Sequence, residues 1–220
     1  GNGNTGGNAP VGSSHPYGSG VTVSGNSGNL VKTGHTFAGW NTAADGSGLS
    51  YAPGSTFNMG AAGMTLYAQW TVNSYAVNFQ TNGGSSVGYQ MVEFGQKVTM
   101  PSEPTKTGYT FAGWYTDGGL LTPFSFETPM GAATMTLYAK WTTNSYPVSY
   151  NGNGQTGGTV PPEGSHDYNT SVTVQGNTGE LFKTGYAFAG WNTAADGSGT
   201  PYAEAQTFTI GAGGVVLYAV

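Results

Sequence analysis

The chain has 220 residues and a net charge of −5, and only 7% of its residues are charged. Its basic residues are five lysines that form no cluster, which argues against binding to nucleic acid and against an electrostatic membrane anchor, because both need many cationic contacts. Cysteine is absent and glycine contributes 39 residues, so aromatic cores rather than disulfides must hold the fold together. The neutral polar composition is more typical of secreted surface proteins than of cytosolic enzymes.

Residues 1–72 open with a loop rich in Gly and Asn. A short strand is expected at Val21–Val23, and Asn26–Gly28 favours a turn. The aromatic segment Phe37–Gly48 follows, and the alternation in Leu66–Trp70 indicates a final strand.

Residues 73–143 begin with a clearer pattern. Apolar side chains alternate with polar or small ones over Tyr75–Phe79, which predicts a half-buried strand. Asn82–Gly84 favours a hairpin turn, because Asn and Gly tolerate positive φ, and a second strand is expected over Ser86–Phe94.

The second half of this region contains three further predicted strands. Tyr109–Trp114 is expected to carry a bulge at Gly113, where the apolar spacing shifts. A short strand is expected at Pro123–Phe126, and Met135–Trp141 alternates cleanly.

Residues 144–220 combine sequence patterns of the first and the middle regions. Tyr146–Tyr150 corresponds to the first strand of the middle region, and Val172–Val174 corresponds to the short strand of the first. The segment Phe188–Gly199 is identical to Phe37–Gly48, and Phe111–Gly118 is a divergent third version. The copies recur at roughly 75 residues, which indicates a tandem array of small modules.

The sequence therefore predicts three mainly β domains, 1–72, 73–143 and 144–220, arranged end to end with little or no helix. The joints, Thr71–Ser74 and Thr142–Ser145, are short and lack Gly, so the array should be semi-rigid. The first domain lacks a first strand and the third lacks a closing Trp. The missing strand could come from upstream residues of a longer chain or from a neighbouring subunit.

The motif Thr-Gly-Tyr-x-Phe-x-Gly-Trp at Thr107–Trp114 and Thr184–Trp191, with Leu137–Trp141, closely resembles the Listeria–Bacteroides repeat. This is the B-repeat of internalin-type bacterial surface proteins. The resemblance covers essentially the whole chain in three copies, with His35 where Tyr is usual. It implies a compact β-grasp-like fold with a mixed sheet, found in tandem in extracellular proteins of the bacterial cell surface. The family pattern carries no catalytic residues, so the resemblance implies no enzyme, cofactor or metal.

The predicted core consists of the motif aromatics and the leucine of the last strand in each copy. These residues are Phe37, Trp40, Leu66, Trp70, Phe111, Trp114, Leu137, Trp141, Phe188, Trp191 and Leu217.

Several segments suggest chemistry but have simpler interpretations. The Asp45–Gly48 segment and its copy at Asp196 offer one carboxylate each, which favours a β-turn over a calcium loop. The Gly-rich starts at Gly1 and Gly152 lack the Gly-Lys-Ser/Thr ending and the helix of a phosphate loop.

The titratable residues form no convincing catalytic group. His15 and His166 each follow a serine, but a Ser–His nucleophile also needs an orienting acid and an oxyanion hole, and no nucleophile elbow is visible. His35 replaces an aromatic residue of the motif. Lys140 could form an autocatalytic isopeptide link, but a plain surface lysine is the simpler interpretation. The glutamates occupy mostly non-equivalent repeat positions, as surface charges do: Glu93, Glu103, Glu127, Glu163, Glu180 and Glu204.

One tyrosine per copy (Tyr67, Tyr138, Tyr218) points away from the predicted core face. Tyrosine rings stack on sugars, so these residues could form a binding face, although a minor packing face is the simpler interpretation. The preferred function is a structural stalk, fibre-forming segment or adhesion spacer. Its partners would be neighbouring repeats or a neighbouring subunit. The alternative is a module that binds host glycan or protein through variable loops and the tyrosine faces. Neither function involves nucleic acid or insertion into a membrane.

Overall fold

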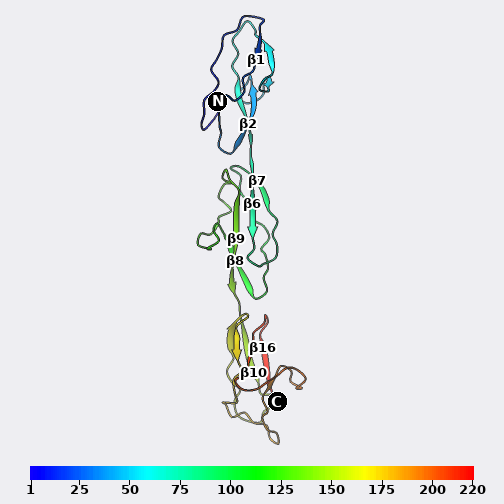
Figure 1. The fold of residues 1–220 in the computed structure, drawn as a ribbon. Helices are drawn as coiled ribbons and strands as arrows, with labels where there is room; N and C mark the ends of the chain where they lie inside the picture. Colours follow the sequence, from blue (N-terminus) through cyan, green and yellow to red (C-terminus); the bar gives the residue numbers. More distant parts are fainter. The chain divides into compact units, whose positions relative to one another are not determined.

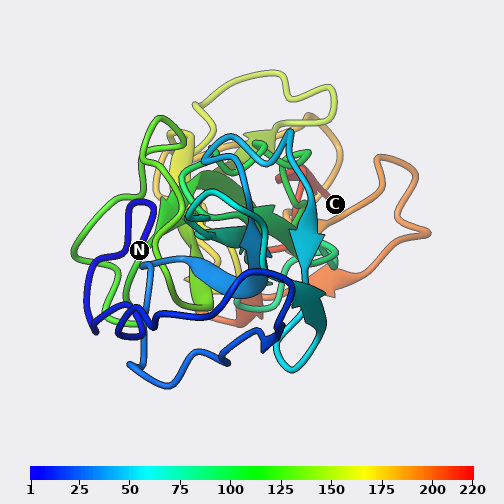
Figure 2. The same cartoon turned by 90° about the horizontal axis from the view of Figure 1, so that it is seen from above.

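A computed structural model describes all 220 residues, Gly1–Val220. Its ribbon consists of strands and loops without any helix (Figure 1 and Figure 2), which confirms the mainly β prediction. The chain divides into two compact units. The first comprises Gly1–Gln80, Val87–Pro101 and Thr116–Leu137, and the second comprises the other residues. The middle repeat of the sequence therefore contributes to both units.

The first repeat contains five strands. They are β1 (Gly20–Thr22), β2 (His35–Asn41), β3 (Ser50–Tyr51), β4 (Thr56–Asn58) and β5 (Tyr67–Val72). β1 and β4 form an antiparallel ribbon, and the other three form a sheet in the order β3-β2-β5. The register between β2 and β5 shifts between Phe37 and Gly39. Gly39 has a φ of 127°, which a residue with a side chain rarely adopts.

The middle repeat contains four strands. They are β6 (Ser74–Gln80), β7 (Gln90–Glu93), β8 (Tyr109–Tyr115) and β9 (Met135–Thr143), in the sheet order β7-β6-β9-β8. The register between β8 and β9 shifts between Phe111 and Trp114, and Gly113 has a φ of 112°. The bulge predicted at Gly113 is therefore confirmed.

Two predicted strands of the middle repeat are wrong in extent. The strand expected over residues 86–94 is only β7, because residues 81–89 form a loop rather than a tight hairpin. Asn82 has a positive φ of 50°, and its side chain donates to the carbonyl oxygen of Ala139 at 2.8 Å. Residues 123–126 form no regular strand: Pro123 makes only an isolated bridge, and residues 126 and 127 lie in a turn.

The third repeat contains seven strands. They are β10 (Ser145–Asn151), β11 (Gly164–Asp167), β12 (Ser171–Thr173), β13 (Trp191–Asn192), β14 (Pro201–Tyr202), β15 (Thr207–Thr209) and β16 (Val215–Ala219). β12 and β15 form a ribbon like that of β1 and β4, and the other five form a sheet in the order β11-β10-β16-β13-β14. β10 lies parallel to β16 (Figure 1), and the other pairs are antiparallel.

β5 and β16 are equivalent strands with different neighbours. β16 lies between β10 and β13, whereas β5 is the edge strand of its sheet. Leu217 in β16 is completely buried, but its counterpart Leu66 is only half-buried and Met64 is 37% exposed. The open strand edge therefore leaves part of the first repeat's core uncovered.

Each repeat places a tryptophan at the centre of its buried residues. Trp40, Trp114 and Trp191 are 5%, 4% and 1% exposed. In the third repeat the buried cluster consists of Val148, Tyr150, Val172, Val174, Leu181, Trp191, Ile210 and Leu217. In the first repeat it consists of Val23, Leu30, Trp40 and Ala68. The smaller cluster of the first repeat agrees with its open edge.

The other predicted core residues vary in burial. Leu137 is completely buried. Phe37, Leu66 and Trp70 pack half-buried against the cluster of the first repeat. Phe111 and Trp141 are also half-buried, whereas Phe188 is 37% exposed.

Candidate functional site

The two Asp-Gly-Ser-Gly segments form tight turns. Asp45 Oδ1 accepts hydrogen bonds from the hydroxyl and the backbone N–H of Ser47 at 2.7 and 3.0 Å. The copy of this turn, between Asp196 and Ser198, has the same two bonds. The serine hydroxyl and then its N–H hold the pKa of each carboxyl below its ordinary value of 3.8. The carboxylates thus serve as hydrogen-bond acceptors within their own turns.

The Gly-rich loops present an asparagine to the last strand of each repeat. Asn2 Nδ2 donates to the carbonyl oxygen of Ala68 at 2.8 Å, and Asn82 bonds Ala139 in the same way. The third copy, Asn153, donates to Ala219 at 3.0 Å. All three asparagines have positive φ angles between 50° and 54°. The three loops are therefore hydrogen-bonded to the last strand of their repeats in the same way.

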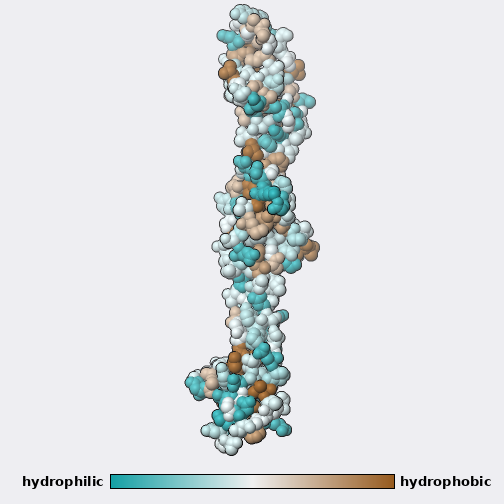
Figure 3. All heavy atoms as spheres, turned by 180° about the vertical axis from the view of Figure 1, so that it is seen from behind, coloured by the Kyte–Doolittle hydropathy of each residue, from teal (hydrophilic) through white to brown (hydrophobic).

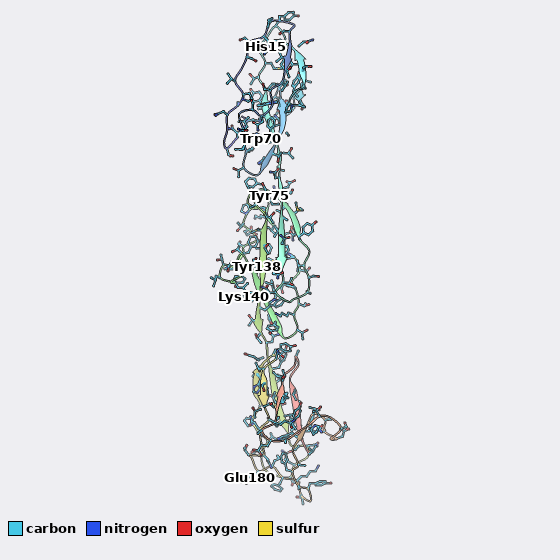
Figure 4. The ribbon with its side chains drawn as sticks, viewed as in Figure 1. His15, Trp70, Tyr75, Tyr138, Lys140 and Glu180 are labelled. Atoms are coloured by element: carbon cyan, nitrogen blue, oxygen red, sulfur yellow. The ribbon has the colours of Figure 1, made fainter.

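The histidines and glutamates lie apart from one another. His15 Nε2 is 2.7 Å from the hydroxyl of Ser13 rather than that of Ser14, and His166 lies on β11. All six glutamates named above are exposed, among them Glu180 (Figure 4), and Glu127 pairs with Lys97. No group of three or more His, Asp or Glu could hold a metal ion.

The predicted tyrosine faces are partly covered. Tyr67 is 36% exposed, while Tyr138 and Tyr218 are half-buried. Tyr138 and Lys140 lie on β9 (Figure 4), and Lys140 Nζ lies 4.8 Å from the ring centre of Tyr115. On the face seen in Figure 3, apolar residues form scattered spots rather than one continuous patch.

Asn41 and Asn192 are buried polar residues that sequence reasoning missed. Asn41 is 1% exposed and Asn192 is 3% exposed. Asn41 Nδ2 donates to the carbonyl oxygens of Gly46 and Gly48 at 3.1 and 3.2 Å, and its Oδ1 accepts from the backbone N–H of Ala43 at 2.8 Å. The sequence did contain a signal for this role. Each asparagine directly precedes the loop sequence that the first and third copies share, and the middle copy has no asparagine at this position.

In the middle copy a carboxylate closes the equivalent loop. Asp117 Oδ2 accepts from the backbone N–H of Thr122 at 2.9 Å, and Oδ1 accepts from that of Leu121 at 3.2 Å. The hydrogen bond from the backbone N–H of Thr122 is the largest of the causes that hold the pKa of Asp117 below 3.8.

This shift predicts how the loop responds to acid. Because the folded pKa is lower than the unfolded one, the stabilisation is fully present above about pH 3.8 and is lost as the pH falls through the folded pKa. We expect the amide NMR signals of Leu121 and Thr122 to titrate below that pH, and the Asp117→Asn variant to lack this titration. A titration midpoint at or above 3.8 would contradict the assignment.

The most extensive polar and aromatic arrangement surrounds the first joint. Only Asn73 separates β5 from β6, so the joint is shorter than the four residues expected from the sequence. Trp70 and Tyr75 in Figure 4 lie on these two strands. The N–H of Asn73 donates to the carbonyl oxygen of Gly34 at 2.8 Å, and the N–H of Phe94 donates to the carbonyl oxygen of Asn73 at 2.9 Å.

An aromatic ring covers the glycine at this joint. A methyl group built on Gly34 would lie 2.1 Å from a ring atom of Phe94, and the Phe94 ring packs edge-on against His35 at 5.9 Å. Asn73 Oδ1 also accepts from the hydroxyl of Thr36 at 2.6 Å. The first and middle repeats thus meet through a strand linker, three hydrogen bonds and a ring seated on a glycine.

The second joint repeats these contacts. Asn144 alone separates β9 from β10, its N–H donates to Gly108 at 2.9 Å, and its carbonyl oxygen accepts from the N–H of Tyr168 at 2.8 Å. The hydroxyl of Thr110 donates to Asn144 Oδ1 at 2.6 Å. A methyl group on Gly108 would lie 2.1 Å from the ring of Tyr168, which packs edge-on against Tyr109 at 5.8 Å. The Asn-Ser-Tyr sequence shared by both joints was the signal for this site.

Phe188 is more exposed than its counterparts in the other two repeats and packs edge-on against Trp191 at 5.3 Å. Phe37 packs edge-on against Trp70 at 5.8 Å, and Phe111 against Trp141 at 5.6 Å. A cavity of about 220 Å³ lies beside Phe188, lined by the residues Gly152, Asn153, Phe182, Tyr186, Phe188 and Val220 among others.

Comparison with known proteins agrees with the threefold repeat. The family model of the Listeria-Bacteroides repeat domain matches residues 2–69, 75–140 and 146–220. A putative Gly-rich membrane protein of Evansella cellulosilytica is 46% identical over 162 residues, which are 74% of this chain. A putative membrane protein of the same organism is 39% identical over 188 residues, or 86% of the chain.

A third relative, internalin H of Listeria monocytogenes, is 41% identical over 118 residues, or 53% of the chain. The matched parts span only 18%, 28% and 21% of the three relatives. The chain itself contains no helix that is long and apolar enough to cross a membrane.

Proposed function

Because the chain belongs to the Listeria–Bacteroides repeat family, we propose that it is a non-enzymatic structural segment of a bacterial cell-surface protein. Its repeats would act as a semi-rigid extracellular stalk that projects or spaces other parts of that protein. The names of two relatives, which contain the words membrane protein, support a location at the cell envelope. The observation that carries the proposal is that one arrangement of contacts builds both joints.

A stalk must resist bending between its modules, and the joint contacts supply that resistance. With a single residue between strands, few backbone angles are free to change. The carbonyl oxygen, the N–H and the side-chain oxygen of that residue all accept or donate a hydrogen bond. Bending at the joint would break these bonds and lift the aromatic ring from the glycine beneath it.

The proposal predicts that Gly108→Ala makes the second joint flexible. The added methyl group would collide with the Tyr168 ring, so the ring must move and the joint contacts must loosen. In ¹⁵N relaxation measurements, the rotational correlation time of the third repeat should fall toward that of one free repeat.

Gly185→Ala is a matched control for this variant. Gly185 occupies the same position in the third repeat and has a φ of 83°, close to the 80° of Gly108. No atom lies within 4 Å of its added methyl group. Both variants therefore carry the same backbone strain, and only Gly108→Ala disturbs a joint. Equal correlation times for the two variants would argue against a stiff joint and thus against the stalk.

A further inference from the structure

The Gly-rich loop of every repeat has the sequence Asn-Gly at the same place. The pairs are Asn2 with Gly3, Asn82 with Gly83, and Asn153 with Gly154. Both residues of each pair have positive φ angles, which in the middle repeat are 50° and 86°. There the N–H of Gly84 donates to the carbonyl oxygen of Thr81 at 3.1 Å. Asn82 and Gly83 are therefore the two central residues of a type I′ turn.

An asparagine that precedes a glycine can be attacked by its own backbone. The glycine nitrogen loses its proton and bonds to Cγ of the asparagine, while the side-chain nitrogen takes up a proton and leaves as ammonia. The resulting succinimide ring is opened by water at either carbonyl group, which gives an aspartate or an isoaspartate. Glycine favours the attack because it has no side chain in the way, and asparagine is accordingly a thermolabile residue.

The type I′ turn of the middle repeat opposes this reaction. Ring closure needs Cγ of Asn82 and the nitrogen of Gly83 on the same side of the bond between Cα and the carbonyl carbon. In a type I′ turn, ψ of the first central residue is about +30°, which places that nitrogen on the side opposite to Cβ. The peptide unit between the two residues must therefore turn over before the nitrogen can reach Cγ.

Hydrogen bonds to distant segments hold this turn in place. Asn82 Nδ2 donates to the carbonyl oxygen of Ala139 at 2.8 Å, and Lys106 Nζ donates to the carbonyl oxygen of Asn82 at 2.9 Å. Trp141 Nε1 donates to the carbonyl oxygen of Thr81 at 2.8 Å. The glycine of the pair is itself exposed, so solvent can take its proton once the turn opens.

We propose that Asn82 and Gly83 form a latent self-modification site, which the native turn keeps unreactive and which reacts when the turn opens. Refolding cannot reverse the reaction, because the amide nitrogen has left as ammonia. Both products lack a donor for the carbonyl oxygen of Ala139 at neutral pH, and both bring a negative charge toward it. An opening that leads to reaction therefore leaves a permanently weakened loop, whether or not the repeats form a stalk.

The third repeat contains an independent copy of this site. Asn153 Nδ2 donates to the carbonyl oxygen of Ala219, and Lys183 Nζ donates to the carbonyl oxygen of Asn153 at 3.2 Å. Asn153 and the glycine after it have φ angles of 50° and 80°. Because the two sites lie in separate loops, each serves as a reference for the other in the same sample.

The test follows deamidation by peptide mapping with mass spectrometry, in folded protein at mildly alkaline pH and in urea as the open reference. In the folded wild type, Asn82 should react at least about tenfold more slowly than in urea, because the turn must first break its hydrogen bonds. Lys106→Met removes one of these bonds and leaves the Asn-Gly pair intact. It should speed the reaction of Asn82 about fivefold and leave Asn153 unchanged, and Lys183→Met should do the reverse.

Lys97→Met is the matched control, because it removes a lysine from an exposed ion pair of the same repeat. It should change neither rate, and circular dichroism checks that all variants are folded. Asn82→Asp reproduces one of the two products, so the N–H of Gly84 should exchange with deuterium faster in this variant than in the wild type.

Equal rates for Asn82 in folded and unfolded wild type would overturn the proposal, since the turn would then give no protection. A rate that is unchanged or slower in Lys106→Met would also overturn it. A slower rate would mean that the ammonium group assists the attack by polarising the carbonyl group of Asn82 instead of holding the turn closed. Unchanged deuterium exchange in Asn82→Asp would contradict the weakened loop.

Discussion

Replacing Trp191 with alanine should destabilise the third repeat by about 3 to 5 kcal/mol, the usual range for removing a large buried aromatic side chain. Trp191 is 1% exposed, and its ring packs edge-on against Tyr150 at 4.7 Å and Phe188 at 5.3 Å. Its Nε1 donates to the carbonyl oxygen of Gln175 at 2.8 Å. A whole domain is stable by only about 5 to 15 kcal/mol, so little stability would remain.

The measurement is denaturant unfolding followed by the NMR signals of residues 144–220. Trp191→Phe is the control: it keeps an aromatic ring in the core but loses the hydrogen bond to Gln175, so it should cost less than the alanine variant. The first repeat should unfold as before in both variants, because its buried cluster contains no residue of the third. An unchanged midpoint for Trp191→Ala would mean that this tryptophan is not the centre of its core.

The repeat pattern predicted the parts of the fold that depend on local sequence. Alternation in Met135–Trp141 and the irregular spacing at Gly113 were enough to find β9 and the bulge in β8, because side-chain period and glycine φ are local properties. The sequence also placed a buried tryptophan in each copy. It failed at residues 123–126, where a short strand was expected; Phe124 and Phe126 pack edge-on against each other.

The joint could not be predicted from one copy, because its parts come from two repeats. Gly34 and Phe94 are 60 positions apart, and nothing near either residue shows that a ring lies on a glycine. Asn73 looked like one of four linker residues, yet it is the single residue between β5 and β6. Contacts between distant segments depend on the tertiary arrangement, and local patterns carry little information about them.

The last prediction concerns Asn41, whose amide group organises the loop that follows β2. Its Nδ2 donates to Gly46, Gly48 and the hydroxyl of Ser50, and its Oδ1 accepts from the N–H groups of Ala43 and Gly48. Asn41→Asp keeps the shape but removes every donor, so a buried carboxylate would face two carbonyl oxygens. Each unsatisfied buried group costs about 1 to 3 kcal/mol, and we expect a loss of about 3 kcal/mol or more at neutral pH.

The pH dependence separates this cause from a general packing defect. Burial beside carbonyl oxygens should raise the folded pKa of the new carboxyl above its unfolded value. The folded state then binds the proton more tightly, so the loss should shrink as the pH falls through the folded pKa toward the unfolded one. Asn41→Ala has no titrating group and should show a loss that lacks this dependence, while Asn192→Asp should reproduce the effect in the third repeat. If Asn41→Asp and Asn41→Ala lost the same stability at every pH, the amide would not be the group that holds the loop.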